Sequence, residues 1–228
     1  MAILQSFPPL LGDGHGRYRV LIVGNSGKGW GRQVLDLTTD DPMLHELSLP
    51  TTGIALARIL NVPYISMDSI MWQPGWVHTP PEQFQARLRQ AMDQEPDRGW
   101  VADGDYESRS ASLAFHDSTD IVWLDPPLAL YLPRLIWRTF LRLLGLREPC
   151  SPGCPERVSE AFFSKDSIIW WCISHHWSSR EKYRRKMEEL GLGIGTNVNG
   201  RKMRRLGGWG QHLRNWLTDV EDMVRSHR

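Results

Sequence analysis

The stretch VLIVGNSGKGWGRQ (residues 20–33) joins an apolar run to a glycine loop of the kind that binds phosphate. The run over residues 18–24 is rich in β-branched side chains and stops at Gly24, which is typical of a buried parallel strand. The following residues up to Lys28 read like the start of a phosphate cradle, in which backbone N–H groups and a lysine surround the anion. Such a loop should continue as Gly-Lys-Ser/Thr into a helix, whereas Gly-Trp-Gly comes next here.

Length and composition indicate one ordinary globular domain. The 228 residues are 41% hydrophobic and 23% charged, enough for a sizeable core. The net charge of +1 gives no general attraction to nucleic acid or anionic membrane, and no apolar run reaches the roughly 20 residues that span a bilayer. The beginning of the chain lacks the pattern of a secretion signal, and three cysteines fit a reducing compartment. We expect a cytoplasmic monomer with no membrane or nucleic-acid partner.

Short apolar runs alternate with helical patterns along the chain. Alternation of this kind predicts an α/β fold whose parallel sheet is wrapped by helices on both faces. Strands are predicted at residues 18–24, 62–68, 99–105, 118–125 and, more weakly, 192–198. Helices are predicted at residues 51–61, 81–94, 128–144, 165–190 and 207–227.

The residues that end the strands suggest the chemistry. Ligands of parallel α/β sheets bind beyond the carboxyl ends of the strands, where Gly24, Asp68, Asp103 and Asp125 are expected. Phosphoryl transfer needs N–H groups and a cation around the phosphates, Mg²⁺, and an acid that holds the metal or its waters. Asp103 and Asp125 are therefore candidate metal ligands, and Asp68 is the candidate that accepts a proton from, or orients, an acceptor hydroxyl.

Two arginines are candidates for neutralising the transferred phosphoryl group. Arg109 follows the third strand, and Arg138 lies in a stripe of arginines at i, i+4 spacing on the helix predicted over residues 128–144. Other interpretations stay open at this point. A strand-end acid can cap a turn or form a surface salt bridge, and the stripe, Arg142 above all, can be a solvated helix face.

The order of these segments resembles that of a known family. LIVGNSG, TTGIALARIL, PYISMDSIMWQPGW, GWVADGDY and TDIVWLDPP look like the adenylate-kinase-like P-loop kinases, and most like the group called DNA topology modulation proteins. CSPGCPE, SIIWWCISHHW, REKY and KMRRLGGWG resemble its fungal members, so the resemblance covers nearly the whole chain.

The resemblance implies a fold and an activity. The fold would be a single P-loop domain over residues 1–228, three layers around a five-stranded parallel sheet, with a short lid at about 145–165. The activity would be transfer of the γ-phosphoryl group of ATP, with Mg²⁺, to a small acceptor such as a nucleotide, a nucleoside or another hydroxyl compound. Nothing in the matching residues points to DNA topology.

The resemblance also assigns roles residue by residue. Asp68 and Asp103 match the acids after the second and third strands, and Arg138 and Arg147 match basic residues that lead into the lid. The implied nucleotide-binding residues are Gly24, Asn25, Ser26, Gly27, Lys28, Thr51 and Thr52.

Residues 28–50 depart from the family pattern. A family member would run from Gly24-Asn25-Ser26-Gly27 through Gly-Lys-Ser/Thr directly into the helix that begins at Thr51. The atypical insert is either a genuine surface excursion or a translated intron, and a spliced message without it would support the second interpretation. Because it separates the glycine loop from the helix that should hold the phosphates, we expect weak ATP binding by this chain. The alternative functions are a degenerate P-loop protein that binds nucleotide or nucleic acid weakly without catalysis, and an ATPase.

Two cysteines in the predicted lid raise the question of zinc. The spacing of Cys150 and Cys154 is loose for a structural zinc site, so a reduced lid loop is the default interpretation. The basic cluster at residues 184–186 is expected to be an exposed helix face, with an arginine contact to the phosphates as the alternative. The cluster at residues 201–205 is expected to be a solvated loop, with a contact to nucleic acid or the nucleotide as the alternative.

Overall fold

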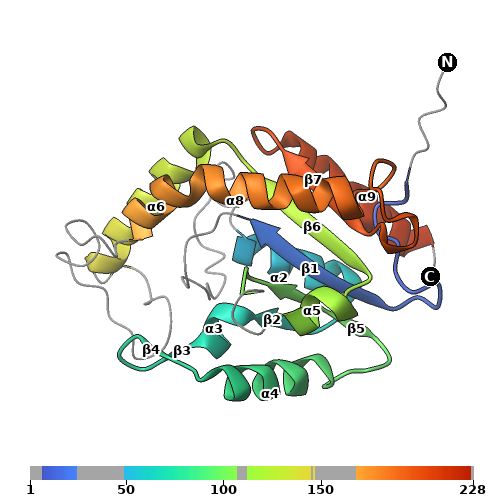
Figure 1. The fold of residues 1–228 in the computed structure, drawn as a ribbon, viewed down its shortest axis with the longest axis horizontal. Helices are drawn as coiled ribbons and strands as arrows, with labels where there is room; N and C mark the ends of the chain where they lie inside the picture. The colour runs from blue at the N-terminus through green and yellow to red at the C-terminus, as the bar shows by residue number, and fades with distance from the viewer. Residues whose placement is uncertain (1–6, 25–48, 107–111, 145, 147–167, 227–228) are drawn as a thin grey trace.

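Five parallel strands form the sheet at the centre of the protein (Figure 1). The computed structural model describes residues 7–24, 49–106, 112–144, 146 and 168–226. The strand order is β2-β5-β1-β6-β7 and every pairing is parallel, which confirms the predicted α/β class. The strands are β1 (Tyr18–Gly24), β2 (Tyr64–Ser66), β5 (Gly99–Asp103), β6 (Asp120–Asp125) and β7 (Met203–Gly207).

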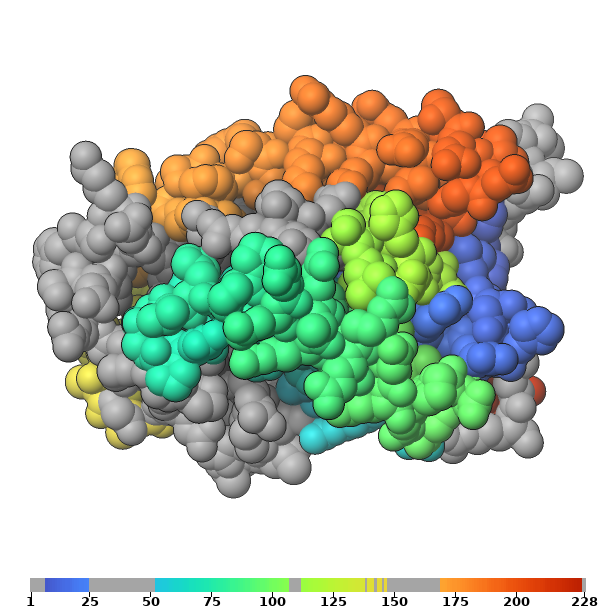
Figure 2. Space-filling model, turned by 60° about the horizontal axis from the view of Figure 1, so that its bottom comes forward, coloured from blue at the N-terminus to red at the C-terminus, as the bar shows by residue number. Residues whose placement is uncertain are grey.

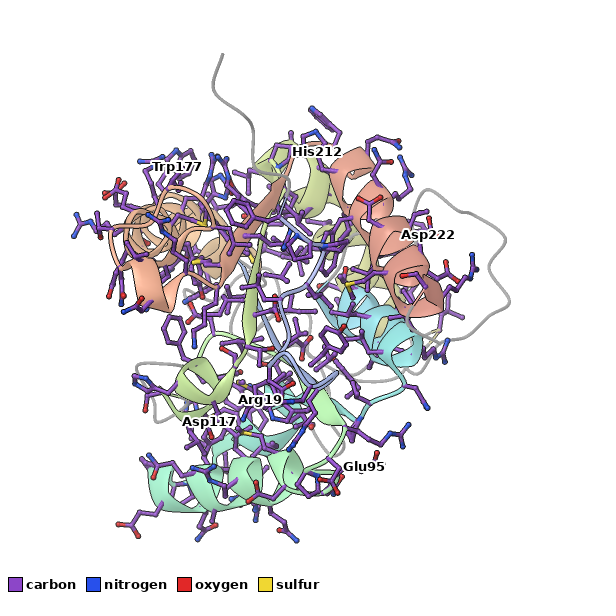
Figure 3. All side chains as sticks on the ribbon, turned by 90° about the vertical axis from the view of Figure 1, so that its right-hand side faces the viewer. Arg19, Glu95, Asp117, Trp177, His212 and Asp222 are labelled. Atoms are coloured by element: carbon purple, nitrogen blue, oxygen red, sulfur yellow. The ribbon has the colours of Figure 1, made fainter. Side chains whose placement is uncertain are left out.

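Helices cover both faces of the sheet, as Figure 3 shows in a view from the side. Successive residues of β1 point to opposite faces, so Val20 and Ile22 join one cluster of buried residues while Leu21 and Val23 join another. The first cluster packs against α2 (Leu49–Leu60) and α9 (Gln211–Ser226). The second packs against α3 (Met67–Met71), α4 (Pro81–Met92), α5 (Ser112–Asp117) and α8 (Ile168–Leu190). The central strands are buried on both sides, which explains their continuous apolar runs.

Two long helices extend beyond the sheet. The helix α6 (Leu128–Leu143) follows β6 and lies against the first half of α8 in Figure 1, with Leu135 and Cys172 buried between them. The hydroxyl of Tyr131 on α6 lies 2.9 Å from Nδ1 of His176 on α8, and this hydrogen bond connects the two helices. Apart from Leu146, the predicted lid at about 145–165 lies outside the described residues, as do Cys150 and Cys154.

The prediction of the last strand was wrong. Residues 192–197 form a turn and irregular backbone, Val198 begins a short 3₁₀ helix, and the strand lies at Met203–Gly207 instead. Gly191 explains the difference, because its amide donates to the carbonyl of Met187 and its own carbonyl accepts from the amide of Gly195 at 2.7 Å, so the chain folds back on itself. The strand β7 is an edge strand, and its Arg204 and Arg205 are the kind of charged residues that edges tolerate.

Other boundaries agree more closely with the sequence. The predicted strand over 62–68 is shortened, because Met67 and Asp68 already belong to α3. A small antiparallel hairpin, β3 (Trp72–Gln73) and β4 (Val77–His78), follows α3 and was not predicted. None of the helices in the described ranges combines the length and apolar character that crossing a membrane requires.

Candidate functional site

Three neighbouring strands end in a glycine or an acid at one edge of the sheet. The register pairs Asp103 with Ile22 of β1, and Gly24 with Leu124 of β6, so Gly24 lies between the ends of β5 and β6. A Cβ on Gly24 would lie 2.7 Å from the carbonyl oxygen of Leu124, which leaves no room for a side chain. In the strand order, β2 lies on one side of β1, while β7 lies on the other side of β6. Parallel sheets bind ligands at the carboxyl ends of strands where successive connections run in opposite directions in this way.

The helix α2 also begins at this edge. Thr52 in its first turn is buried, and the backbone of Gly53 lies so close to the ring of Tyr64 that a Cβ there would be 2.6 Å from the ring. The hydroxyl of Tyr64 in turn lies beside the carboxyl group of Asp103. Gly24 and the first turn of α2 therefore both lie near Asp103.

The buried Asp103 and the partly buried Asp68 form an acidic pair. Asp103 is 5% exposed, and burial, with a further contribution from the charge of Asp68, raises its pKa to about 8 against the opposing effect of the Tyr64 hydroxyl. Burial of the Tyr64 hydroxyl, together with the charge of Asp103, raises the pKa of Tyr64. Tyr106 donates a hydrogen bond from its hydroxyl to Oδ1 of Asp68. At neutral pH Asp103 therefore favours its protonated, uncharged form.

The raised pKa of Asp103 predicts a pH-dependent stability. An acid with a pKa near 3.9 when unfolded and about 8 when folded binds more protons in the folded state between these values, so its contribution to stability falls as pH rises. In buffer without divalent cations, we expect the free energy of unfolding to fall by about 3 kcal/mol between pH 6 and pH 9 through this group.

The Asp103→Asn variant isolates that contribution, since other groups titrate equally in both proteins. Urea unfolding at pH 6 and pH 9 should show a smaller decrease for the variant than for the wild type. An equal decrease in the two proteins would show that Asp103 ionises normally.

Asp125, at the end of β6, is held by two arginines. Its Oδ1 lies 2.8 Å from Nε of Arg180, and its Oδ2 accepts from Nε of Arg205 at 2.8 Å, while its side chain is only 2% exposed. The guanidinium group of Arg205 also lies 5.1 Å from the centre of the Trp123 ring, where a cation is attracted. These ion pairs favour a role for Asp125 in positioning the two arginines rather than in binding a metal ion.

Removing the carboxylate of Asp125 should destabilise the fold. Asp125→Ala leaves the charges of Arg180 and Arg205 without their buried partner, and because both arginines are partly exposed, we expect a loss of about 2 kcal/mol in the free energy of unfolding. The exposed Asp97 provides the matched control, and Asp97→Ala should change stability by less than about 0.5 kcal/mol. Equal urea midpoints for the two variants would contradict a structural role for the Asp125 ion pairs.

Two cationic side chains of α8 lie at the carboxyl edge of the sheet, and the sequence analysis did not predict them. Arg180 contacts Asp125, and Lys182 lies 2.6 Å from Oδ1 of Asp105, two residues after β5. By contrast, Arg184 and Arg185 pair with Glu181 on the exposed side of the helix, in agreement with the expected exposed face. Arg205 belongs to the cluster that was expected to be a solvated loop, and this expectation was wrong because the cluster includes a strand.

The other predicted residues are only partly described. Arg138 is on α6, but its side chain, like that of Thr51, lies outside the described residues. Asn25, Ser26, Gly27, Lys28, Arg109 and Arg147 lie wholly outside them. Gly24, Thr52, Asp68, Asp103 and Asp125 are thus the predicted site residues that the structure describes near this edge.

Other features carry less chemistry. A shallow groove of about 500 Å³ lies between α4 and α5, lined by residues such as Glu82, Arg89 and His116, and no strand ends in it. Among the described residues, no group of three or more His, Cys, Asp and Glu side chains could hold a metal ion by itself. A magnesium site here would therefore need oxygen atoms from a bound phosphate or water.

No protein-family model and no curated protein sequence matches this chain. What the structure defines is an α/β protein with an acidic pair and two arginine-bound carboxylate oxygens at the carboxyl edge of a parallel sheet.

Proposed function

We propose that this protein is an ATP-binding phosphotransferase of the adenylate-kinase-like type, which transfers the γ-phosphoryl group to a small acceptor. One observation carries the proposal: Gly24, which admits no side chain, lies between the buried Asp103 and the arginine-bound Asp125 at a single edge of the sheet. Phosphoryl transfer depends on positioning and charge neutralisation, and this edge offers close backbone, acids and cations together.

Asp103 fits a magnesium ion. Carboxylate oxygens are the protein ligands that Mg²⁺ prefers, and Asp103 supplies them at the end of β5, next to Asp68. Asp125 fits less well because both of its oxygens already interact with arginines. Asp103 would therefore hold the ion or its waters, and the bound ion would neutralise charge on the phosphate oxygens. Because Asp103 is protonated near neutral pH, cation binding should release a proton and tighten as pH rises toward 8.

Asp68 would take the acceptor proton. The acceptor hydroxyl oxygen forms the new bond to the γ-phosphorus while the bond from that phosphorus to the departing ADP breaks, and the hydroxyl proton passes to the carboxylate of Asp68. Tyr106 orients that carboxylate through its hydrogen bond. Arg180 lies at the same edge through Asp125 and provides a positive charge for the phosphoryl oxygens.

A second function is favoured by a different observation. Residues 25–48 separate β1 from α2, whereas a phosphate loop joins its strand to its helix within a few residues. The inserted residues take the place of the short loop whose consecutive N–H groups would surround the phosphates. The chain would then be a degenerate P-loop protein that binds nucleotide weakly without transfer, or, if water is the acceptor, an ATPase.

The consumption of Mg-ATP with a panel of nucleosides, nucleotides and sugars separates these functions. Turnover that depends on an acceptor supports the phosphotransferase, and equal turnover with and without acceptor supports the ATPase. Binding without turnover supports the degenerate protein. The assay should include both the 228-residue chain and a form in which residues 28–50 are replaced by a short loop, because the insert is expected to lower activity.

A further inference from the structure

The β3–β4 hairpin is fixed to the helix that carries Asp68. The amide of Trp72 donates to the carbonyl of Asp68 one turn earlier on α3, and the amide of Thr79 donates to the carbonyl of Met71 at 2.8 Å. The hydroxyl of Thr79 also donates to the carbonyl of Ile70 at 2.7 Å. In Figure 1 the hairpin projects from the end of α3, and in Figure 2 the segment with α3 and the hairpin (teal) forms part of the molecular surface. The hairpin therefore keeps a set position relative to the candidate base.

Aromatic rings line this hairpin. The ring centres of Trp72 and Trp76 are 5.5 Å apart and their planes meet at 78°, while the ring of His78 lies 4.3 Å from that of Trp72 at 35°. Two indoles at nearly a right angle form a corner in which a flat ring can stack on one indole and contact the other with its edge. Base–aromatic stacking of this kind tolerates any heteroaromatic ring, because each has a π face.

The backbone of Trp76 is strained. Its φ is +61°, directly after Gly75 at +75°. Glycine, asparagine and aspartate are the usual residues in the left-handed region, and a bulky residue there is an outlier. If the turn alone determined the residue at position 76, a small residue would serve it better. Strain of this kind is retained at functional sites when the side chain itself is required.

We propose that Trp72 and Trp76 bind the planar ring of the acceptor, so that the acceptor is a nucleoside-like alcohol whose hydroxyl reaches Asp68. This inference rests on the proposed function and names the acceptor class for it. The ring is held by stacking on the hairpin, and the hydroxyl group that extends from it is presented to the carboxylate at the start of α3.

Binding without ATP tests the inference separately from catalysis. Isothermal titration of the 228-residue chain with adenosine, guanosine, cytidine and thymidine should show binding, and titration with ribose should show none. Trp76→Gly should weaken nucleoside binding about tenfold or more while its urea midpoint stays equal or rises, because glycine adopts a positive φ without strain. Trp76→Asn should behave similarly. The matched control is Trp209→Ser, which alters a 68% exposed tryptophan outside the hairpin and should leave binding unchanged.

Each contrary outcome identifies what has failed. Absence of nucleoside binding by the wild type, or wild-type affinity in Trp76→Gly, overturns the inference. A marked loss of stability in both Trp76 variants assigns the ring to packing and also overturns it. Nucleoside binding without phosphoryl transfer contradicts the proposed function and leaves the inference standing. Transfer to a sugar that Trp76→Gly does not affect supports the proposed function and contradicts the inference.

Discussion

Replacing residues 28–50 with Ser-Gly-Lys is expected to tighten Mg-ATP binding at least about a hundredfold. The replacement makes Gly24 to Thr51 read Gly-x₄-Gly-Lys-Thr, the pattern in which consecutive N–H groups and a lysine surround the phosphates. The binding edge is otherwise present, since Gly24, the first turn of α2 and Asp103 are already near one another. Isothermal titration of both proteins with Mg-ATP measures the difference.

A second shortened chain provides the control for loop length. If residues 28–50 are replaced with Ser-Gly-Ala, the helix is restored but the lysine is not, and binding should lie between the other two proteins. Equally tight binding by the 228-residue chain and the Ser-Gly-Lys form would show that the insert does not disturb the nucleotide site.

In the Ser-Gly-Lys form, Asp68→Asn is expected to lower kcat by about 10²- to 10³-fold, with little change in the KM for ATP. Asparagine keeps the shape of the side chain and can still accept the hydrogen bond from Tyr106, but it cannot take the acceptor proton. Asp97→Asn is the matched control, because Asp97 is exposed and precedes β5 at the opposite edge of the sheet. A kcat for Asp68→Asn within a fewfold of the unsubstituted form would exclude Asp68 as the base.

The same variant has a second readout that does not depend on turnover. The charge of Asp68 contributes to the raised pKa of Asp103, so Asp68→Asn should lower that pKa. The fall in the free energy of unfolding with rising pH should then be complete at a lower pH than in the wild type. An unshifted pH profile would show that the two acids do not interact.

Local pattern was sufficient for the central strands and for two of the acids. The strands β1, β5 and β6 are buried on both faces, so their apolar runs are continuous and their ends are easy to place. Asp103 and Asp125 were predicted at those ends for this reason. Asp68 was predicted at a strand end but begins α3, because β2 stops at Ser66.

The partners of the acids could not be predicted in the same way. Arg180 and Arg205 reach Asp125 from α8 and β7, 55 and 80 residues further along the chain. Nothing near Asp125 in the sequence indicates either arginine. The strand β7 was not predicted because it contains two arginines and few apolar residues. The pKa of Asp103 likewise depends on burial that no local pattern reports. The hairpin could have been inferred from Pro74-Gly75, a turn signal between aromatic residues.

Hydrogen exchange in the presence of Mg-ATP locates the bound phosphates most directly. With the Ser-Gly-Lys form, we predict slower amide exchange around Gly24, Asp103 to Tyr106 and the part of α8 that contains Arg180, where the strand ends and their cations meet. Protection confined to the groove between α4 and α5, or no protection at saturating Mg-ATP, would contradict a nucleotide site at the carboxyl edge of the sheet.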